Sequence, residues 1–347
     1  MQKHTSRMAK IASLSMIAAL AMSSFASTAF ANGNGGGQET CETHTLQVNL
    51  IPGDPTLYNL EGELCWKGSK ENKPVQVLVH GATYDRSYWN FPGEGNQLSY
   101  VKAAVKEKYV TFAYDRLGSG VSAKPLGILV NVDNSAYVNH QVIQALRAGT
   151  FGTSFDEVVL VGHSFGSLIA VASASTYPAD VDALVLTGFA HQATAQANAG
   201  TQASVYPASF DPKFATAGLD EFYFTTVPGT RAGLFFSDFV KAATLALDEE
   251  KKDLMTLGLV LDIPRHFSTE SLAITAPVYM IMGSEDYLYC GENVDCSDND
   301  SYEDYEEGFF SSSVDTKVVK KAGHSLNLHK SSKDAFKAIN KWIDHNL

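Results

Sequence analysis

The chain has 347 residues, of which 45% are hydrophobic and 18% are charged, so it can bury a sizeable core and is not a disordered protein. Its net charge of −12 argues against nucleic acid as a partner. The length allows two domains or one large α/β domain that carries an insertion.

Residues 1–31 have the pattern of a secretory signal peptide. Three basic residues precede an apolar run, and Ala29-Phe30-Ala31 has the small-x-small form of a cleavage site. Serine and threonine dilute the run, which favours a cleaved signal over a membrane anchor. We therefore expect an exported protein, periplasmic or extracellular, without a stable membrane anchor after cleavage. Residues 32–40 are Gly-rich at their start and are expected to form a flexible leader.

The cysteines form an even set, Cys41, Cys65, Cys290 and Cys296. Four cysteines in an exported chain allow three disulfide pairings, and sequence proximity favours Cys41–Cys65 and Cys290–Cys296. The sequence contains no CxxC motif and no Cys/His cluster. We therefore expect no metal site, and no cofactor is called for.

The expected elements begin with two alternating segments, 45–50 and 60–66, which predict an antiparallel strand pair. Short, mostly apolar strands then alternate with helices, which favours an α/β, doubly wound, mostly parallel sheet with an antiparallel start. The expected strands are 75–79, 110–114, 158–161, 183–187, 278–282 and 316–319, and the expected helices are 97–108, 136–148, 165–177 and 330–346. This core would comprise residues 41–189 and 274–347.

The alternation stops between the strands ending at 187 and starting at 278, a gap too long for an unstructured loop. Helical patterns at 235–247 and 249–261 predict that residues 190–273 form a helical cap over the carboxyl ends of the strands. Aromatic residues are dense there, and as a group they predict a pocket for hydrophobic acyl or aromatic substrates. They are Phe210, Phe214, Phe222, Tyr223, Phe224, Phe235, Phe236 and Phe239.

The strongest chemical signal is Gly162-His163-Ser164-Phe165-Gly166, which lies between an expected strand and an expected helix. The bare pattern occurs often by chance, but this setting presents Ser164 at the end of the sheet as a nucleophile. A serine hydroxyl needs a histidine base that a carboxylate orients. In a strand-turn-helix site of this kind the acid and then the histidine follow the serine along the chain.

Asp286 and His324 each follow an expected strand, so we expect both beside Ser164. Glu285 and His329 are the competing residues for the acid and the base. The backbone amides of Phe165 and Ala82 are expected to bind the oxyanion, Ala82 because it follows His80-Gly81 at a strand end.

Successive motifs of this chain, from about Val75 to the C-terminus, resemble those of the α/β-hydrolase superfamily. They are His80-Gly81, the segment 115–122, the elbow 162–166, Gly283-Ser284-Glu285-Asp286 and Ala322-Gly323-His324. The second motif, residues 115–122, departs from the commoner form Asp-x-Arg-Gly-x-Gly-x-Ser, because Arg116 directly follows Asp115. This variant of the motif resembles that of a subgroup of secreted hydrolases. We expect both residues to be structural. The resemblance implies the fold and the serine triad, and Ser164 argues against dehalogenases and epoxide hydrolases, which have aspartate there.

Residues 285–307 contain ten acidic residues and no Lys or Arg. A calcium loop is one interpretation, but the EF-hand spacing is missing, so a solvated loop tied by Cys290–Cys296 is favoured.

The leading hypothesis is an exported serine hydrolase that cleaves a small, hydrophobic carboxylic ester or lactone through an acyl-enzyme. An aminopeptidase or amidase would need an acid in the cap, such as Asp220, Glu221 or Asp238, to bind an amine. A cofactor-free perhydrolase of the same fold, or a ligand-binding protein without turnover, are further alternatives.

Overall fold

The computed structural model describes residues 39–266, 270–291 and 293–347. The predicted signal peptide and most of the predicted leader, residues 1–38, lie outside this range. The first strand begins at Glu39, so the last two residues assigned to the leader belong to a strand instead. Within the described residues, no helix is both long enough and apolar enough to cross a bilayer.

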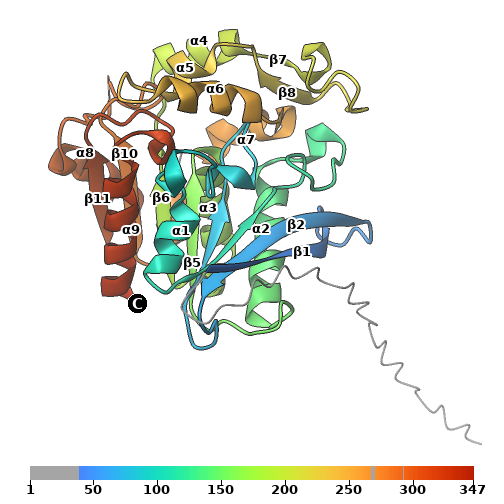
Figure 1. Ribbon diagram of the computed structural model, residues 1–347, viewed down its shortest axis with the longest axis vertical. Coiled ribbons are helices and arrows are strands. Elements are labelled where there is room, and N and C mark those ends of the chain that lie inside the picture. Colours follow the sequence, from blue (N-terminus) through green and yellow to red (C-terminus); the bar gives the residue numbers. More distant parts are fainter. Residues whose placement is uncertain (1–38, 267–269, 292) are drawn as a thin grey trace, which may run out of the picture.

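An eight-stranded sheet in the order β1-β2-β4-β3-β5-β6-β10-β11 forms the centre of the protein (Figure 1). β1 and β2 are antiparallel to their neighbours and the other strands are parallel, which confirms the predicted α/β fold with an antiparallel start. The strands are β1 (Glu39–Asn49), β2 (Leu57–Lys67), β3 (Val75–Val79), β4 (Val110–Tyr114), β5 (Val158–His163), β6 (Ala183–Thr187), β10 (Val278–Gly283) and β11 (Val314–Val319).

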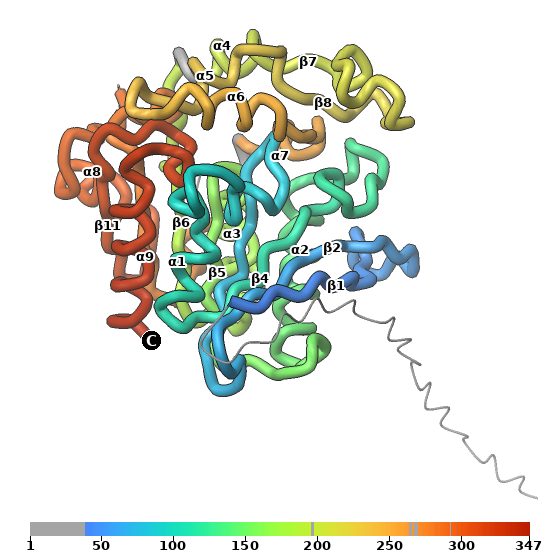
Figure 2. The backbone as a smooth tube through the Cα atoms, viewed as in Figure 1, coloured from blue at the N-terminus to red at the C-terminus, as the bar shows by residue number. Residues whose placement is uncertain are grey.

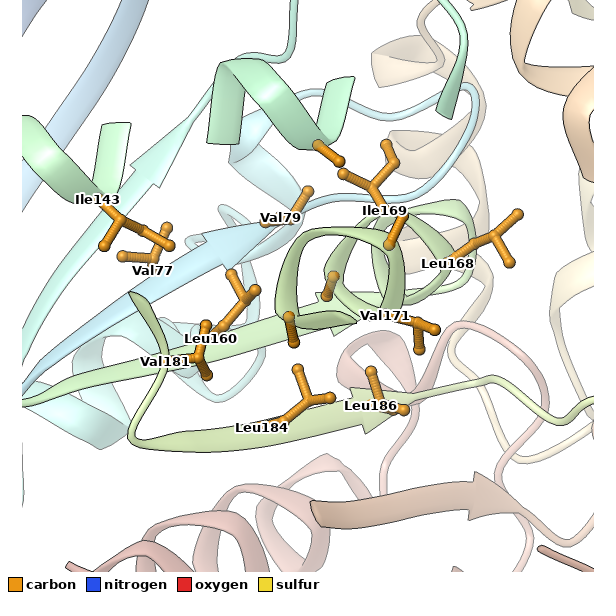
Figure 3. Packing of buried hydrophobic residues seen from close by; sticks show 14 of the residues in the cluster. Val77, Val79, Ile143, Leu160, Leu168, Ile169, Val171, Val181, Leu184 and Leu186 are labelled. Atoms are coloured by element: carbon orange, nitrogen blue, oxygen red, sulfur yellow. The ribbon is translucent and has the colours of Figure 1, made fainter. Parts of the chain in front are cut away.

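Helices cover both faces of this sheet, because the central strands are apolar on both sides. α1 (Tyr100–Lys106) and α9 (Ser332–Asn346) lie on one face, and α2 (Val132–Arg147) and α3 (Phe165–Thr176) lie on the other. Along β5, Leu160 packs in the α2–α3 core and Val161 in the α1–α9 core. Figure 3 shows Leu160 and Leu184 beneath α3. Full burial of such a side chain contributes about 1.5–3 kcal/mol.

The chain between β6 and β10 forms a layer above the carboxyl ends of the strands, at the top of Figures 1 and 2. Its longest elements are helices, but it also contains a small antiparallel sheet, β7-β8-β9, that the sequence pattern did not indicate. Its elements are α4 (Ala195–Ser204), β7 (Val205–Pro207), β8 (Tyr223–Thr226), α5 (Arg231–Phe235), α6 (Ala242–Lys251), β9 (Met255–Thr256) and α7 (Leu257–His266). We call this segment the insertion.

Two helices expected in the insertion have different bounds in the structure. The first, 235–247, is divided into α5 and α6 by a loop at 236–241. The second, 249–261, is interrupted after Lys251, where the chain enters β9 before α7 begins. In both breaks backbone groups bond to the core instead of to their own helix: the amide of Asp253, for example, donates to the carbonyl oxygen of Thr83 at 2.8 Å.

Both favoured disulfides are present. Cys41 and Cys65 face each other across the β1–β2 pair, and Cys290–Cys296 closes a short loop after β10. Two disulfides are compatible with export. The acidic segment that follows is not only a loop, because it includes α8 (Asn299–Glu306), whose first turn is capped by the Asp298 carboxylate.

Candidate active site

Ser164 occupies the sharp turn between β5 and α3, at φ 55° and ψ −120°. A positive φ is rare for a residue other than glycine, so the surrounding turn must impose this conformation. Glycines allow the chain to pack this closely. A Cβ atom at Gly162 would lie 2.5 Å from the carbonyl oxygen of Gly166, and one at Gly166 would lie 2.1 Å from that of Val79. The amide of Ser164 donates to the Thr187 carbonyl oxygen at 2.9 Å, which fixes the turn against β6.

Asp286 and His324 follow β10 and β11 and lie in contact, as their positions after neighbouring strands predict. The Asp286 Oδ2 atom is 2.8 Å from His324 Nδ1, and both side chains are buried. The other carboxylate oxygen, Oδ1, accepts the backbone amide of Leu288 at 2.9 Å. His324 Nε2 is buried and has no hydrogen-bond partner among the described residues. The competing acid, Glu285, is exposed.

His329 supports the loop that carries His324. Its Nε2 accepts the amides of Gly323 at 3.0 Å and Ser237 at 3.1 Å, so Nδ1 carries the proton and donates it to the Ser325 carbonyl oxygen at 2.9 Å. Burial lowers the pKa of His329 to about 4, so the ring is neutral at neutral pH. With both nitrogens bonded to the backbone, His329 is a structural residue.

His163, inside the serine motif, lies beneath the catalytic candidates. Its ring stacks on Tyr88 at 4.3 Å between centroids and lies 5.0 Å from the ring of His324. Burial, followed by the nearby His324, lowers the pKa of His163 well below its ordinary value. His163 therefore provides a neutral, packed surface behind His324.

A cavity of about 220 Å³ opens between the core and the insertion, directly over Ser164. Ser164 and His324 both line it, and so do the two residues expected to bind the oxyanion, Ala82 and Phe165. Its walls are mainly apolar, and no Asp, Glu, Lys or Arg occurs among the described residues that line it. The described lining therefore carries no carboxylate, ammonium or guanidinium group.

The insertion contributes aliphatic and uncharged polar walls to this cavity, and most of the aromatic residues expected to form the pocket do not line it, which corrects that prediction. Of the aromatic residues expected there, Phe235 lines the cavity. Phe210 is 72% exposed, and Phe214 and Tyr223 form a separate small core within the insertion. The insertion supplies the aliphatic residues Ala193, Val205, Leu234, Met255, Val260 and Ile263 and the polar residues Asn198, Thr201, Gln202 and Thr226.

The loop of residues 80–84 after β3, which we call the oxyanion loop, passes close to Ser164. A Cβ atom at Gly81 would lie 3.1 Å from the Ser164 Cβ. Buried Arg116 donates from Nε to the His80 carbonyl oxygen and from Nη2 to that of Gly81, both at 3.1 Å. The amides of Ala82 and Phe165 donate no hydrogen bond to the loops and turns that the structure describes.

Asp115, beside Arg116 in the sequence, accepts the backbone amides of Arg86 at 2.8 Å and Val121 at 2.9 Å. Neither Asp115 nor Arg116 lines the cavity. Burial lowers the pKa of Arg116 to about 10, which leaves it charged at neutral pH.

A second buried arginine that bonds to the oxyanion loop, Arg231 of α5, was not found from the sequence. It pairs with Asp248 of α6 and also contacts Thr83. Two opposite charges seventeen positions apart, in a segment that contains many charges, give no sequence signal.

The sheet, the serine turn, the Asp286–His324 pair and the shared cavity together define a hydrolase of the α/β-hydrolase class. A sequence model of the alpha/beta hydrolase family matches residues 76–338, and the chain belongs to this family of enzymes.

Individual relatives are more distant. The chain is 31% identical over 112 residues to the "Putative carbamate hydrolase RutD" of Escherichia coli O9:H4, a stretch that covers 32% of this chain and 36% of the relative. An esterase from Thermogutta terrifontis, solved with malate bound, has a TM-score of 0.60 at 16% identity, covering 87% of this chain and 99% of its own. An esterase from Exiguobacterium antarcticum has a TM-score of 0.59 at 16% identity, covering 83% and 96%. At these identities the solved structures establish the fold.

Proposed function

We propose that the protein is an exported serine hydrolase that cleaves neutral carboxylic esters or lactones with an apolar acyl group. The observation that carries this proposal is the shared cavity, into which Ser164 and His324 both open while Asp286 holds the far side of the histidine ring.

In the proposed reaction, Ser164 Oγ attacks the ester carbonyl carbon and His324 Nε2 takes the hydroxyl proton. Asp286 accepts a hydrogen bond from Nδ1–H, which keeps Nε2 unprotonated before the attack and stabilises the imidazolium afterwards. The amides of Ala82 and Phe165 donate to the oxyanion, each contributing about 3–4 kcal/mol in comparable sites. His324 then returns the proton to the leaving alcohol, and water releases the acid from Ser164 by the reverse sequence.

The absence of charged side chains among the described cavity residues supports a neutral substrate over the aminopeptidase alternative. An amine would need a carboxylate close to the cavity, and the acids considered for that role do not line it. Asp220, for example, accepts the amides of Phe222 and Gly127 at 2.9 Å each. The apolar walls would favour longer acyl chains by about 0.8 kcal/mol per buried methylene.

The test is covalent labelling combined with turnover. A fluorophosphonate probe should label wild type and not Ser164→Ala, and p-nitrophenyl esters should be hydrolysed by wild type alone. Ser154→Ala, at an exposed serine, is the matched control and should behave as wild type. Labelling that survives in Ser164→Ala would overturn the nucleophile. Wild-type protein that is labelled but hydrolyses no ester, lactone or aminoacyl anilide would favour a ligand-binding role, and a preference for the anilides would favour a peptidase.

A further inference from the structure

We propose, building on the serine-hydrolase function above, that Arg231 is a positioning residue: from the insertion, it holds the oxyanion loop in the shape that aims the Ala82 amide at the reacting carbonyl. The insertion would then do more than line the acyl pocket, because the position of the Ala82 amide would depend on the packing of the insertion against the core.

Arg231 is buried, with about 1% of its side chain exposed, and each of its three guanidinium nitrogens donates a hydrogen bond. Nε and Nη2 donate to the two carboxylate oxygens of Asp248 at 2.6 Å and 3.0 Å, the two-pronged geometry that suits arginine. The remaining nitrogen, Nη1, donates to the hydroxyl of Thr83 at 2.8 Å and to its carbonyl oxygen at 3.2 Å. One guanidinium thus connects α5 and α6 of the insertion to the residue directly after Ala82.

Thr83 needs this support because its backbone is strained, with φ at +57°. A β-branched residue rarely adopts a positive φ, and it persists there only where the surroundings fix it. The insertion supplies two further bonds: the Thr83 amide donates to the Leu254 carbonyl oxygen at 3.2 Å, and the Asp253 amide donates to the Thr83 carbonyl oxygen at 2.8 Å. Without them the loop would relax toward an unstrained backbone.

The core holds the other side of Ala82. Arg116 donates to the carbonyl oxygen of Gly81, which belongs to the same peptide group as the Ala82 amide. Because the C=O and N–H of a trans peptide point in opposite directions, a carbonyl held on Arg116 directs the Ala82 N–H away from it. The peptide groups on both sides of Ala82 are therefore fixed, one by the core and the next by the insertion.

Arg231 also supports two aromatic walls of the cavity. Its guanidinium carbon lies 4.5 Å from the ring centroid of Tyr84 and 5.0 Å from that of Phe235. The Phe235 ring lies 5.7 Å from that of His324. Loss of the guanidinium would therefore disturb the oxyanion loop directly and His324 indirectly, through the Phe235 ring.

The test compares Arg231→Met with Lys252→Met. Lys252 is a matched control because it forms a buried ion pair of the same insertion, with Asp211 at 2.6 Å, and the other partners described for its ammonium group are Glu249 and the Thr226 carbonyl oxygen, both outside the oxyanion loop. Arg231→Met should lower kcat by roughly 10- to 100-fold with KM changed little, since a misplaced donor acts on the transition state. It should lose affinity for a trifluoromethyl ketone, which forms a tetrahedral adduct with Ser164, by the same factor as kcat/KM. Lys252→Met should retain both.

Thr83→Val provides a second arm in case Arg231→Met folds poorly, because it removes the hydroxyl that Arg231 Nη1 bonds while it keeps a β-branched residue at the strained position and leaves the Arg231–Asp248 pair intact. It should show the same loss of kcat and of ketone affinity. Wild-type kcat in either Arg231→Met or Thr83→Val, or an equal loss in Lys252→Met, would overturn the proposal. If wild type itself were not labelled at Ser164, the serine-hydrolase function would fail instead, and the two failures are distinguishable.

Discussion

Replacing Asp286 with asparagine should remove nearly all activity while preserving the shape of the site. The buried carboxylate makes two defined bonds, from Oδ2 to His324 Nδ1 and from Oδ1 to the amide of Leu288. The Leu288 amide can only donate, so the asparagine must present its carbonyl oxygen there and its NH₂ group to His324. The opposite orientation would leave the Leu288 donor unpaired, at a cost of about 1–3 kcal/mol.

An NH₂ group facing Nδ1 forces that nitrogen to accept, which moves the ring proton to Nε2. His324 then cannot take the proton of Ser164. A comparable triad loses about 10⁴-fold in kcat from this substitution, which corresponds to about 5 kcal/mol of transition-state stabilisation. We expect a loss of that size here, with KM nearly unchanged, because the cavity walls do not include Asp286.

The assay is steady-state hydrolysis of p-nitrophenyl butyrate, with thermal unfolding followed in parallel to verify folding. Glu285→Gln is the matched control, since it makes the same chemical change at the neighbouring, exposed carboxylate. It should retain wild-type kcat. Asp286→Asn with activity within tenfold of wild type would refute the tautomer argument, and a larger loss in Glu285→Gln would assign the acid to Glu285.

Further predictions concern the cavity wall, the backbone, the disulfides and a buried acid. Leu234→Ala enlarges the cavity and should shift the preferred p-nitrophenyl ester toward longer acyl chains, by about 0.8 kcal/mol per added methylene; an unchanged chain-length profile would contradict this. Gly188→Ala places a Cβ atom 3.2 Å from His324 Nδ1, at a position with φ +55°, and should displace the histidine. We expect kcat to fall by about 10²-fold relative to wild type, with both enzyme concentrations determined by fluorophosphonate titration. Peptide mapping without reduction should recover Cys290 linked to Cys296; two free thiols in exported protein would count against the bond. Burial raises the pKa of Asp253 to about 7. Above about pH 4 the folded state therefore still binds a proton at Asp253 that the unfolded state has released. The free energy of unfolding of wild type falls for this reason as pH rises from about 4 to 7. Relative to wild type, Asp253→Asn should therefore gain unfolding free energy as pH rises from about 4 to 7 and keep that gain above pH 7, as measured by urea denaturation.

Sequence pattern alone was sufficient for elements whose environment is uniform. β3, β4 and β6 have the predicted bounds, because strands buried on both faces appear as unbroken apolar runs. The proximity of Asp286 to His324 followed from the rule that parallel strands end at one edge of the sheet.

The insertion could not be predicted in the same way, because its conformation depends on contacts with distant parts of the chain. Helical periodicity continues through residues 236–241, yet the Ser237 amide bonds to His329 and the helix ends before it. Phe236 packs on His329, and Phe239 lies under Lys330 instead of facing the cavity. Composition identified an aromatic-rich segment, but it does not contain the information on which side chains face inward.

The bonds between the insertion and the active-site loops have a consequence for the exchange of segments between related enzymes. Besides the contacts at Thr83, the Ser325 amide donates to the Phe235 carbonyl oxygen at 2.9 Å, and the Ser237 hydroxyl donates to that of Lys321 at 2.7 Å. A chimera that received a foreign segment in place of residues 190–273 would acquire new pocket walls but lose these attachments. Grafting for altered selectivity should therefore transfer the insertion together with residues 80–84 and 321–329 as one unit. For the same reason, substitutions in residues 190–273 should be accompanied by compensating substitutions in residues 80–84 and 321–329 among related enzymes.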